Sequence, residues 1–281
     1  MASMQSLQTA EERLPALPEV KASAPALRNN AAYATHLGLD VLSAFGASFM
    51  VSPFITIVDR SIIQNASGVM QMGDSIRAGI KELVMRPHVF LRRPEFLMIF
   101  GVYSATYTTA NAVNTTCEHR KVDSAWPRFL STSAVNMTSC IAKDRAFTRM
   151  FGSSAPMALP LSTYALFTIR DAGTVGASFN LPGPVSEWLQ AQGMSKARAD
   201  FTAQMACPAA VQFLSTPLHL IGLDLYNNPK STARDRWTFM CSKYTSSVAA
   251  RIGRIGPAFG IGGVGNTAFR KGLRARFAKD A

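Results

Sequence analysis

Two arginines interrupt an apolar, glycine-rich run near the C-terminus, residues 245–269. Arg251 and Arg254 are three residues apart, so on a helix they would share one face. Two guanidinium groups facing a cavity could bind a carboxylate or a phosphate through directed hydrogen bonds. Alternatively, long arginine side chains near a helix end can extend to lipid head groups. Because arginine is costly in hydrocarbon, the run predicts a membrane helix beside something polar.

A second ionic pair, Arg170 and Asp171, lies within another apolar stretch. Ions at membrane depth are usually paired with opposite charges. Adjacent residues on a helix do not face each other, so we expect the partners of this pair on other helices. The pair could contact a substrate, or it could only hold helices together. Asn111, with Tyr103 and Thr106, could line the same cavity or serve helix packing.

Motifs typical of enzymes are missing from the sequence. There is no Gly-rich phosphate loop followed by Lys and Ser or Thr, no His-Glu-x-x-His motif, and no nucleophile with a paired base. GIGGVG at residues 260–265 is similar to a dinucleotide-binding turn, but it follows no predicted strand. Cys117 and His119 form the one close Cys/His pair, which is too little for a zinc site. We therefore expect neither catalysis nor a cofactor nor a metal.

The composition favours a membrane protein. Of 281 residues, 48% are hydrophobic and 16% are charged, whereas about 25% are charged in soluble domains. The net charge of +12 is spread over many loops without a compact basic patch and interleaved aromatics, which argues against nucleic-acid binding. Dispersed positive charge fits contact with anionic lipids, cardiolipin among them.

Six apolar or weakly polar segments are candidates for membrane helices. Most of them contain small residues, such as Gly46, Gly173 and Gly256, which permit close helix contact in lipid. The expected fold is all-α: a six-helix transmembrane bundle over residues 31–281, after a disordered tail over residues 1–30. The segments are residues 37–58, 96–116, 129–142, 157–179, 201–226 and 248–269.

The segments form three pairs, and the first members end in similar text: SPFITIVDR, TSCIAKDR and TPLHLIGLD. The aspartates in these endings, Asp59, Asp144 and Asp224, are 85 and then 80 residues apart. Such a period predicts three pseudo-repeats of a helix pair. Pro53 and Pro217, near the ends of two first members, predict kinked helices, although proline can also simply close a soluble helix.

At these endings the chain resembles the mitochondrial carrier superfamily, whose three repeats each contain a kinked odd helix, a matrix loop with a short helix, and an even helix. The resemblance assigns structural or gate positions to Pro53, Arg60, Lys143, Arg145 and Pro217. The positions at which the carrier motif has its acidic residues hold no carboxylate here. The resemblance therefore implies that the salt bridges closing a carrier on its matrix side are lost.

Other segments extend the resemblance. Arg170 and Asp171 are similar to an Arg–acid pair on the fourth helix of carriers, a substrate contact associated with keto acids. ARIGRIGPAFG at residues 250–260 is similar to the sixth helix of carriers. FLRRPEFLMIFGVYSATYTTANAVNTTCE and SAVNMTSCIAKDRAFTRMFG resemble a group of fungal and algal mitochondrial membrane proteins sometimes labelled sequence orphans. VDRSI and GVYSATYTTANAV are similar to mitochondrial fission process protein. These resemblances imply a multi-pass protein of the mitochondrial inner membrane.

Two functions fit these features. One is transport of a small anion, with Arg170, Asp171, Arg251, Arg254 and Asn111 at the cavity. The other, motivated by the lost gate charges, is a non-transporting scaffold or a morphology or assembly factor with partners among mitochondrial membrane proteins. A soluble helical domain is a third interpretation.

Overall fold

The computed structural model describes residues 30–152 and 160–280, and every regular element in these two ranges is a helix. This confirms the predicted all-α class. The predicted tail lies outside the described residues except for Asn30, as do residues 157–159 of the fourth segment. Three short helices are α3 (Met72–Met85), α4 (Pro87–Phe90) and α8 (Pro182–Ala191). The long ones are α2 (Asn30–Ala66), α5 (Pro94–Arg120), α6 (Ala125–Phe151), α7 (Leu161–Asn180), α9 (Lys196–Asn227), and the run of α10 (Ala233–Gly253), η1 (Pro257–Val264) and α11 (Gly265–Asp280).

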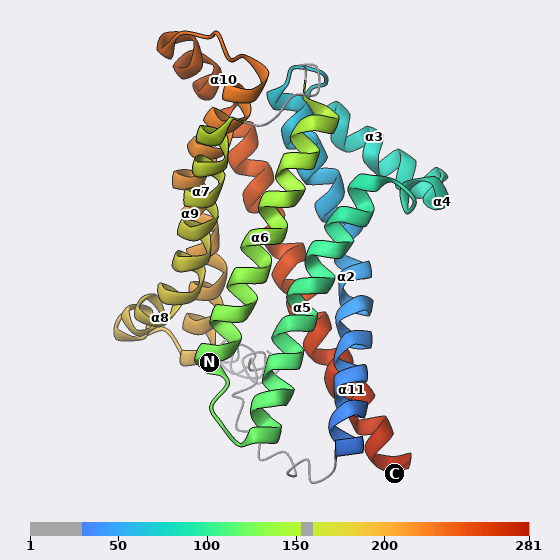
Figure 1. The fold of residues 1–281 in the computed structure, drawn as a ribbon. Helices are drawn as coiled ribbons and strands as arrows, with labels where there is room; N and C mark the ends of the chain where they lie inside the picture. Colours follow the sequence, from blue (N-terminus) through green and yellow to red (C-terminus); the bar gives the residue numbers. More distant parts are fainter. Residues whose placement is uncertain (1–29, 153–159, 281) are drawn as a thin grey trace, which may run out of the picture.

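The long helices form an elongated bundle in which neighbours in the chain are neighbours in space (Figure 1). Contacts follow the order α2, α5, α6, α7, α9 and α10, and the C-terminal run packs back against α2. Three equivalent helix pairs are not evident among the described residues. Short helices α3 and α4 fill the first connection, whereas α9 joins α10 through the brief turn at residues 228–232.

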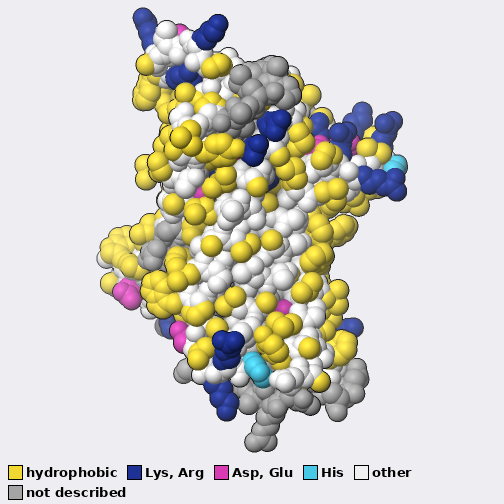
Figure 2. Space-filling view, viewed as in Figure 1, with side chains coloured by type: hydrophobic (Ala, Val, Ile, Leu, Met, Phe, Trp, Pro, Cys, Tyr) yellow, Lys and Arg dark blue, Asp and Glu magenta, His cyan; other side chains and the backbone are white. Residues whose placement is uncertain are grey.

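Helix α2 shows that polarity in the bundle is reversed relative to a water-soluble domain. Its outward side chains are large, apolar and exposed; Phe49, for example, is 49% exposed. Hydrophobic side chains also cover much of the body in Figure 2, and many of the basic ones gather near its ends and on α3 and α4. Contiguous apolar surface of this kind marks contact with hydrocarbon or a partner. The buried side of α2 instead carries Asp40, Ser43, Ser48, Ser52, Thr56 and Asp59.

Two of the described helices, α2 and α9, are long and apolar enough to cross a membrane. By length and composition alone, a core helix of a soluble protein passes the same test. The exposed phenylalanines of α2 separate the two cases, because a core helix buries such side chains. The other long helices are more polar and are not apolar enough by the same test of length and hydropathy. The six predicted segments are therefore helical, but only two of the described helices qualify as apolar membrane spans.

Helices α7 and α9 approach closely at Gly222. A Cβ atom at this position would lie 2.7 Å from the ring of Phe167, which is fully buried and has no room to move. We expect Gly222→Ala to lower the free energy of unfolding by about 1–3 kcal/mol, measured as an earlier thermal transition in detergent. Gly173→Ala on α7 is the matched control, because its Cβ would meet no atom within 4 Å. Equal losses for the two variants would contradict this account of the contact.

Candidate functional site

A polar cavity of about 40 Å³ lies inside the bundle. At about 10–15 Å³ per water molecule, it has room for about three waters and not for a free amino acid. Ionic side chains from several long helices surround it, whereas the outward face of α2 is apolar. The lining residues are Asp59, Ile62 and Ile63 of α2; Cys140, Lys143 and Asp144 of α6; Arg170 and Asp171 of α7; His219 of α9; and Arg251 and Arg254 at the end of α10.

Lys143 connects α6 to α2. Its Nζ lies 2.6 Å from Oδ2 of Asp59 and 2.7 Å from Oδ1 of Asp144. The other oxygen of Asp59 accepts a hydrogen bond from Nη1 of Arg254 at 2.8 Å. One buried carboxylate on α2 therefore holds cations from two other helices, so removing it would leave Arg254 without this partner and Lys143 with Asp144 alone.

Arg170 connects α7 to α6 and α9. Its Nη2 lies 2.5 Å from Oδ2 of Asp144, and its Nη1 lies 2.6 Å from Nδ1 of His219. A guanidinium only donates, so Nδ1 of His219 accepts and its ring proton lies on Nε2. Arg170 Nε also donates to Oδ1 of Asp171 at 2.9 Å. The prediction that these adjacent residues do not meet is wrong, because the long arginine side chain reaches its neighbour while also binding α6.

Arg251 is bound differently from the other cations of the cavity. Its Nε donates to Oε1 of Gln212 at 3.0 Å and its Nη2 to Oγ of Ser215 at 3.2 Å, both on α9. Among the described residues no carboxylate forms an ion pair with it, although its side chain is only 4% exposed. The neutral side chains of Gln212 and Ser215 accept hydrogen bonds from Nε and Nη2 of Arg251, but they do not balance its positive charge.

Charge around the cavity is therefore unequal. The lining residues include the carboxylates of Asp59, Asp144 and Asp171 but four Lys or Arg side chains, so one positive charge is in excess. In addition, Oδ2 of Asp171 is buried and has no hydrogen-bond partner among the described residues. An unmatched cation and an unpartnered carboxylate oxygen thus line one polar space.

The sequence named most of these side chains but not their pairing. Arg170, Asp171, Arg251 and Arg254, predicted as substrate-binding, come together with Lys143, which the resemblance assigned to a gate. The resemblance implied that the salt bridges joining all three odd helices of a carrier are lost; here Lys143 of α6 forms an ion pair with Asp59 of α2. The carboxylates that bind Lys143 and Arg170 lie four residues, about one helical turn, beyond two of the acidic positions of the carrier motif. These two residues, Asp59 and Asp144, were noted only as markers of a period, although an aspartate in an apolar helix is itself a sign of a buried partner.

The remaining predicted residues lie elsewhere. Arg60, at the end of α2, lies 3.4 Å from Oε1 of Glu95 on α5 and outside the cavity lining. Arg145 is exposed on α6. Pro53 and Pro217 lie inside α2 and α9 without ending them. Asn111 belongs to a second ionic cluster, towards the end of the bundle opposite α3 and α4 (Figure 1).

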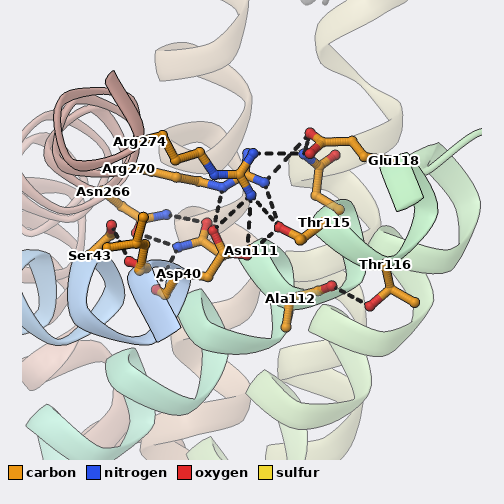
Figure 3. Close-up of polar contacts among 12 residues, drawn as sticks. Asp40, Ser43, Asn111, Ala112, Thr115, Thr116, Glu118, Asn266, Arg270 and Arg274 are labelled. Carbon is orange, nitrogen blue, oxygen red and sulfur yellow. Dashed lines mark hydrogen bonds and ion pairs between the residues drawn. The ribbon is translucent and has the colours of Figure 1, made fainter. Parts of the chain in front are cut away.

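That second cluster centres on Asp40 of α2, which is fully buried (Figure 3). Its Oδ1 accepts from Nε of Arg270 at 2.8 Å and from Nη2 of Arg274 at 3.1 Å. Thr115 of α5 donates to the other oxygen, and Glu118 accepts from Nη1 of Arg274 at 3.0 Å. These two arginines therefore bind α11 to α2 and α5.

A pair of amides adds to this cluster. Nδ2 of Asn111 and Nδ2 of Asn266 each donate to the Oδ1 of the other at 2.9 Å. Nδ2 of Asn111 also donates to the backbone oxygen of Asp40 at 3.2 Å. Asn111 therefore connects three helices and does not line the central cavity.

A family model described as "Probable citrulline exporter" matches residues 43–274 of the chain. The chain belongs to this family. The match spans the whole central cavity and both arginines that bind Asp40. No curated protein and no solved structure matches the chain, and the family match gives no specific support to the carrier or fission-protein resemblance. With the exposed apolar face of α2, membership in an exporter family indicates a membrane protein of the transporter type.

Removing one partner from the ion pairs of the cavity should be costly, because it leaves a buried charge uncompensated. Asp144→Asn removes the carboxylate shared by Lys143 and Arg170, so we expect it to cost about 3–5 kcal/mol of unfolding free energy. Thermal or denaturant unfolding in detergent would measure this. Asp123→Asn, at an exposed position, makes the same chemical change and should cost little. A loss of less than 1 kcal/mol for Asp144→Asn would show that the network is solvated.

Proposed function

We propose that the protein is a multi-pass transporter that exports a small polar solute through the central cavity, with citrulline as the first candidate. The observation that carries this proposal is the ring of ionic side chains from α2, α6, α7 and α10 around one polar space inside an apolar exterior. Ionic residues inside membrane bundles mark substrate or ion pathways. The printed description of the family points to the same class of function.

Buried ion pairs contribute little to stability when compared with well-packed apolar side chains. Their presence on four different long helices is therefore better explained by binding than by folding alone. Because the cavity holds only about three waters, the structure represents a closed conformation. Substrate would enter when the helices separate and the ion pairs exchange partners.

Two groups of opposite charge line the cavity without, among the described residues, a charged partner for Arg251 or a hydrogen bond to Oδ2 of Asp171, and this pair of groups suits a zwitterion. Citrulline is an α-amino acid with a neutral ureido side chain, so it carries one carboxylate and one ammonium group. In this proposal Arg251 binds the carboxylate, because its charge is unmatched in the closed state. The unpartnered Oδ2 of Asp171 accepts from the ammonium group. A simple anion, predicted from the sequence, would satisfy Arg251 but leave Asp171 as it is.

Transport and recognition can be tested together in proteoliposomes loaded with radiolabelled citrulline. We expect export by the wild-type protein, and a rate lower by about tenfold or more for Arg251→Gln, since a hydrogen bond to a charged group contributes about 1.5–3 kcal/mol. Arg149→Gln, at an exposed position of α6, is the control and should match the wild type. Unlabelled amino acid should compete better than the corresponding keto acid.

If wild-type protein moves neither citrulline nor any competitor, the transporter proposal fails. Stronger competition by the keto acid would instead favour the small anion predicted from the sequence. In the absence of any transport, a non-transporting scaffold or assembly factor becomes the better account. Neither proposal assigns a catalytic role or a cofactor to the chain.

We also propose that the protein lies in the mitochondrial inner membrane, on the basis of the sequence resemblances, and that anionic lipids such as cardiolipin contact the α3–α4 arm. This arm, residues 72–92, projects sideways from one end of the bundle (Figure 1). Ile80 and Val84 are exposed on one side of α3, and the basic residues Arg77 and Lys81 are exposed beside them. An apolar stripe flanked by positive charge suits the interface of an anionic bilayer.

The lipid contact predicts a loss that depends on membrane charge. Replacing Arg77 and Lys81 together by Gln should remove about 1 kcal/mol of attraction per charge in membranes that contain anionic lipid. We expect the double variant to unfold at a lower temperature than wild type in nanodiscs containing cardiolipin. In neutral phosphatidylcholine nanodiscs the two should unfold alike. An equal difference in both lipids would point to a packing defect.

A further inference from the structure

The glycine-rich stretch GIGGVG is not used by the central cavity, yet it has an unusual conformation. Residues Pro257–Val264 form a π-helix, η1, between α10 and α11. Long π-helical segments are rare, and short ones occur often at functional sites. The stretch thus separates the helix that carries the cavity arginines from the helix that binds Asp40.

Among the glycines around η1 whose surroundings the structure describes, packing accounts for Gly262 alone. A Cβ atom on Gly262 would collide with the side chain of Tyr107 on α5, whose hydroxyl donates to the backbone oxygen of Ala258 at 3.2 Å. At Gly256, Gly263 and Gly265, an added Cβ would meet no atom within 4 Å. Alanine would fit at all three and would favour an α-helix by about 1 kcal/mol each. What these glycines share is that they make the segment easier to bend.

Beyond this segment, α11 is attached to the rest of the bundle mainly by polar groups. Asp40 binds Arg270 and Arg274, and Asn266 binds Asn111. Charged hydrogen bonds of this kind are strong when dry, but water can replace them when the surface opens. A purely apolar contact would offer no such exchange.

The space between the two clusters is marked by hydroxyl groups along α2. Ser43, Ser48, Ser52 and Thr56 are buried on the same side of the helix as Asp40 and Asp59. Oγ of Ser48 has no hydrogen-bond partner among the described residues. The hydroxyls of Ser43, Ser52 and Thr56 donate to the backbone of α2 itself, and buried apolar residues such as Val51 lie between them. The way from Asp40 to the central cavity is therefore partly polar, and side chains fill it in this conformation.

We propose that α11 is a latch: it swings on the π-helix η1 and releases Asp40, which opens the end of the bundle opposite the α3–α4 arm to the central cavity. This inference rests on the proposed transport function. Arg270 and Arg274 are then locking residues that need not touch the substrate. The central ion pairs bind the solute, and the Asp40 cluster controls its access from one side.

A crosslink tests the movement. A Cβ on Gly46 of α2 would lie 3.7 Å from the ring of Phe269 on α11, and neither residue belongs to the ionic clusters. In a background whose native cysteines, Cys117, Cys140, Cys207 and Cys241, are replaced by serine and which still exports citrulline, a short bis-maleimide should lower export by Gly46→Cys/Phe269→Cys at least tenfold, whereas each single-cysteine variant keeps its rate after the same treatment. Unchanged export by the crosslinked protein would overturn the latch.

The hinge has a matched control in the same run of helices. Gly263→Ala and Gly272→Ala both place a Cβ in open space, but only the first lies in η1. We expect Gly263→Ala to slow export about fivefold or more, and Gly272→Ala to leave it unchanged, with both variants at least as stable as wild type. Equal rates for the two would contradict a hinge at η1.

A measurement that needs no transport separates this inference from the proposed function. Spin labels at the exposed positions Arg120 on α5 and Arg276 on α11 report the distance across the latch. Asp40→Asn should add a population at longer distance, and Gly263→Ala should reduce it. If wild type and Asp40→Asn give the same distances, the latch is wrong, whether or not citrulline is transported. If the distances change but nothing is exported, only the proposed function fails.

Discussion

A charge taken out of water must find an opposite charge, and this constraint organises the interior of the bundle. The outward face of α2 is apolar, so its aspartates can only turn inward, where cations from other helices meet them. The same requirement places Lys143 between two carboxylates and directs Arg170 towards α6. Helix packing and ion pairing are therefore one problem in this fold, because the polar side of each helix faces the others.

Incomplete pairing is as informative as pairing. A structure built only for stability would match each buried charge, since an unmatched one costs free energy. Arg251 is held by an amide and a hydroxyl, and one oxygen of Asp171 has no partner among the described residues. Such groups are ready to bind a ligand that brings the missing charges. The closed, water-sized cavity fits a conformation in which that ligand is not bound.

The two ionic clusters lie at different levels of the bundle and join different helices. The central one involves α2, α6, α7, α9 and α10, whereas the Asp40 cluster involves α2, α5 and α11. Only α2 contributes a carboxylate to both, and the π-helix lies between the two arginine-bearing segments of the C-terminal run. This arrangement would let the Asp40 cluster open before the central ion pairs exchange partners, so that access and binding are separate steps.

The helical class, the apolar segments and most of the ionic residues that lie inside could be predicted from the sequence, because each depends on local composition and spacing. The pairing of these residues could not, because it depends on contacts between segments far apart in the chain. Asp59 meets Arg254 across 195 positions of the chain, and Asp40 meets Arg274 across 234. Asn111 resembled a cavity residue, because a pattern along the chain does not contain the register between helices. That register is set by packing between the helices. If one helix shifted by one turn along another, its charged side chains would meet different partners.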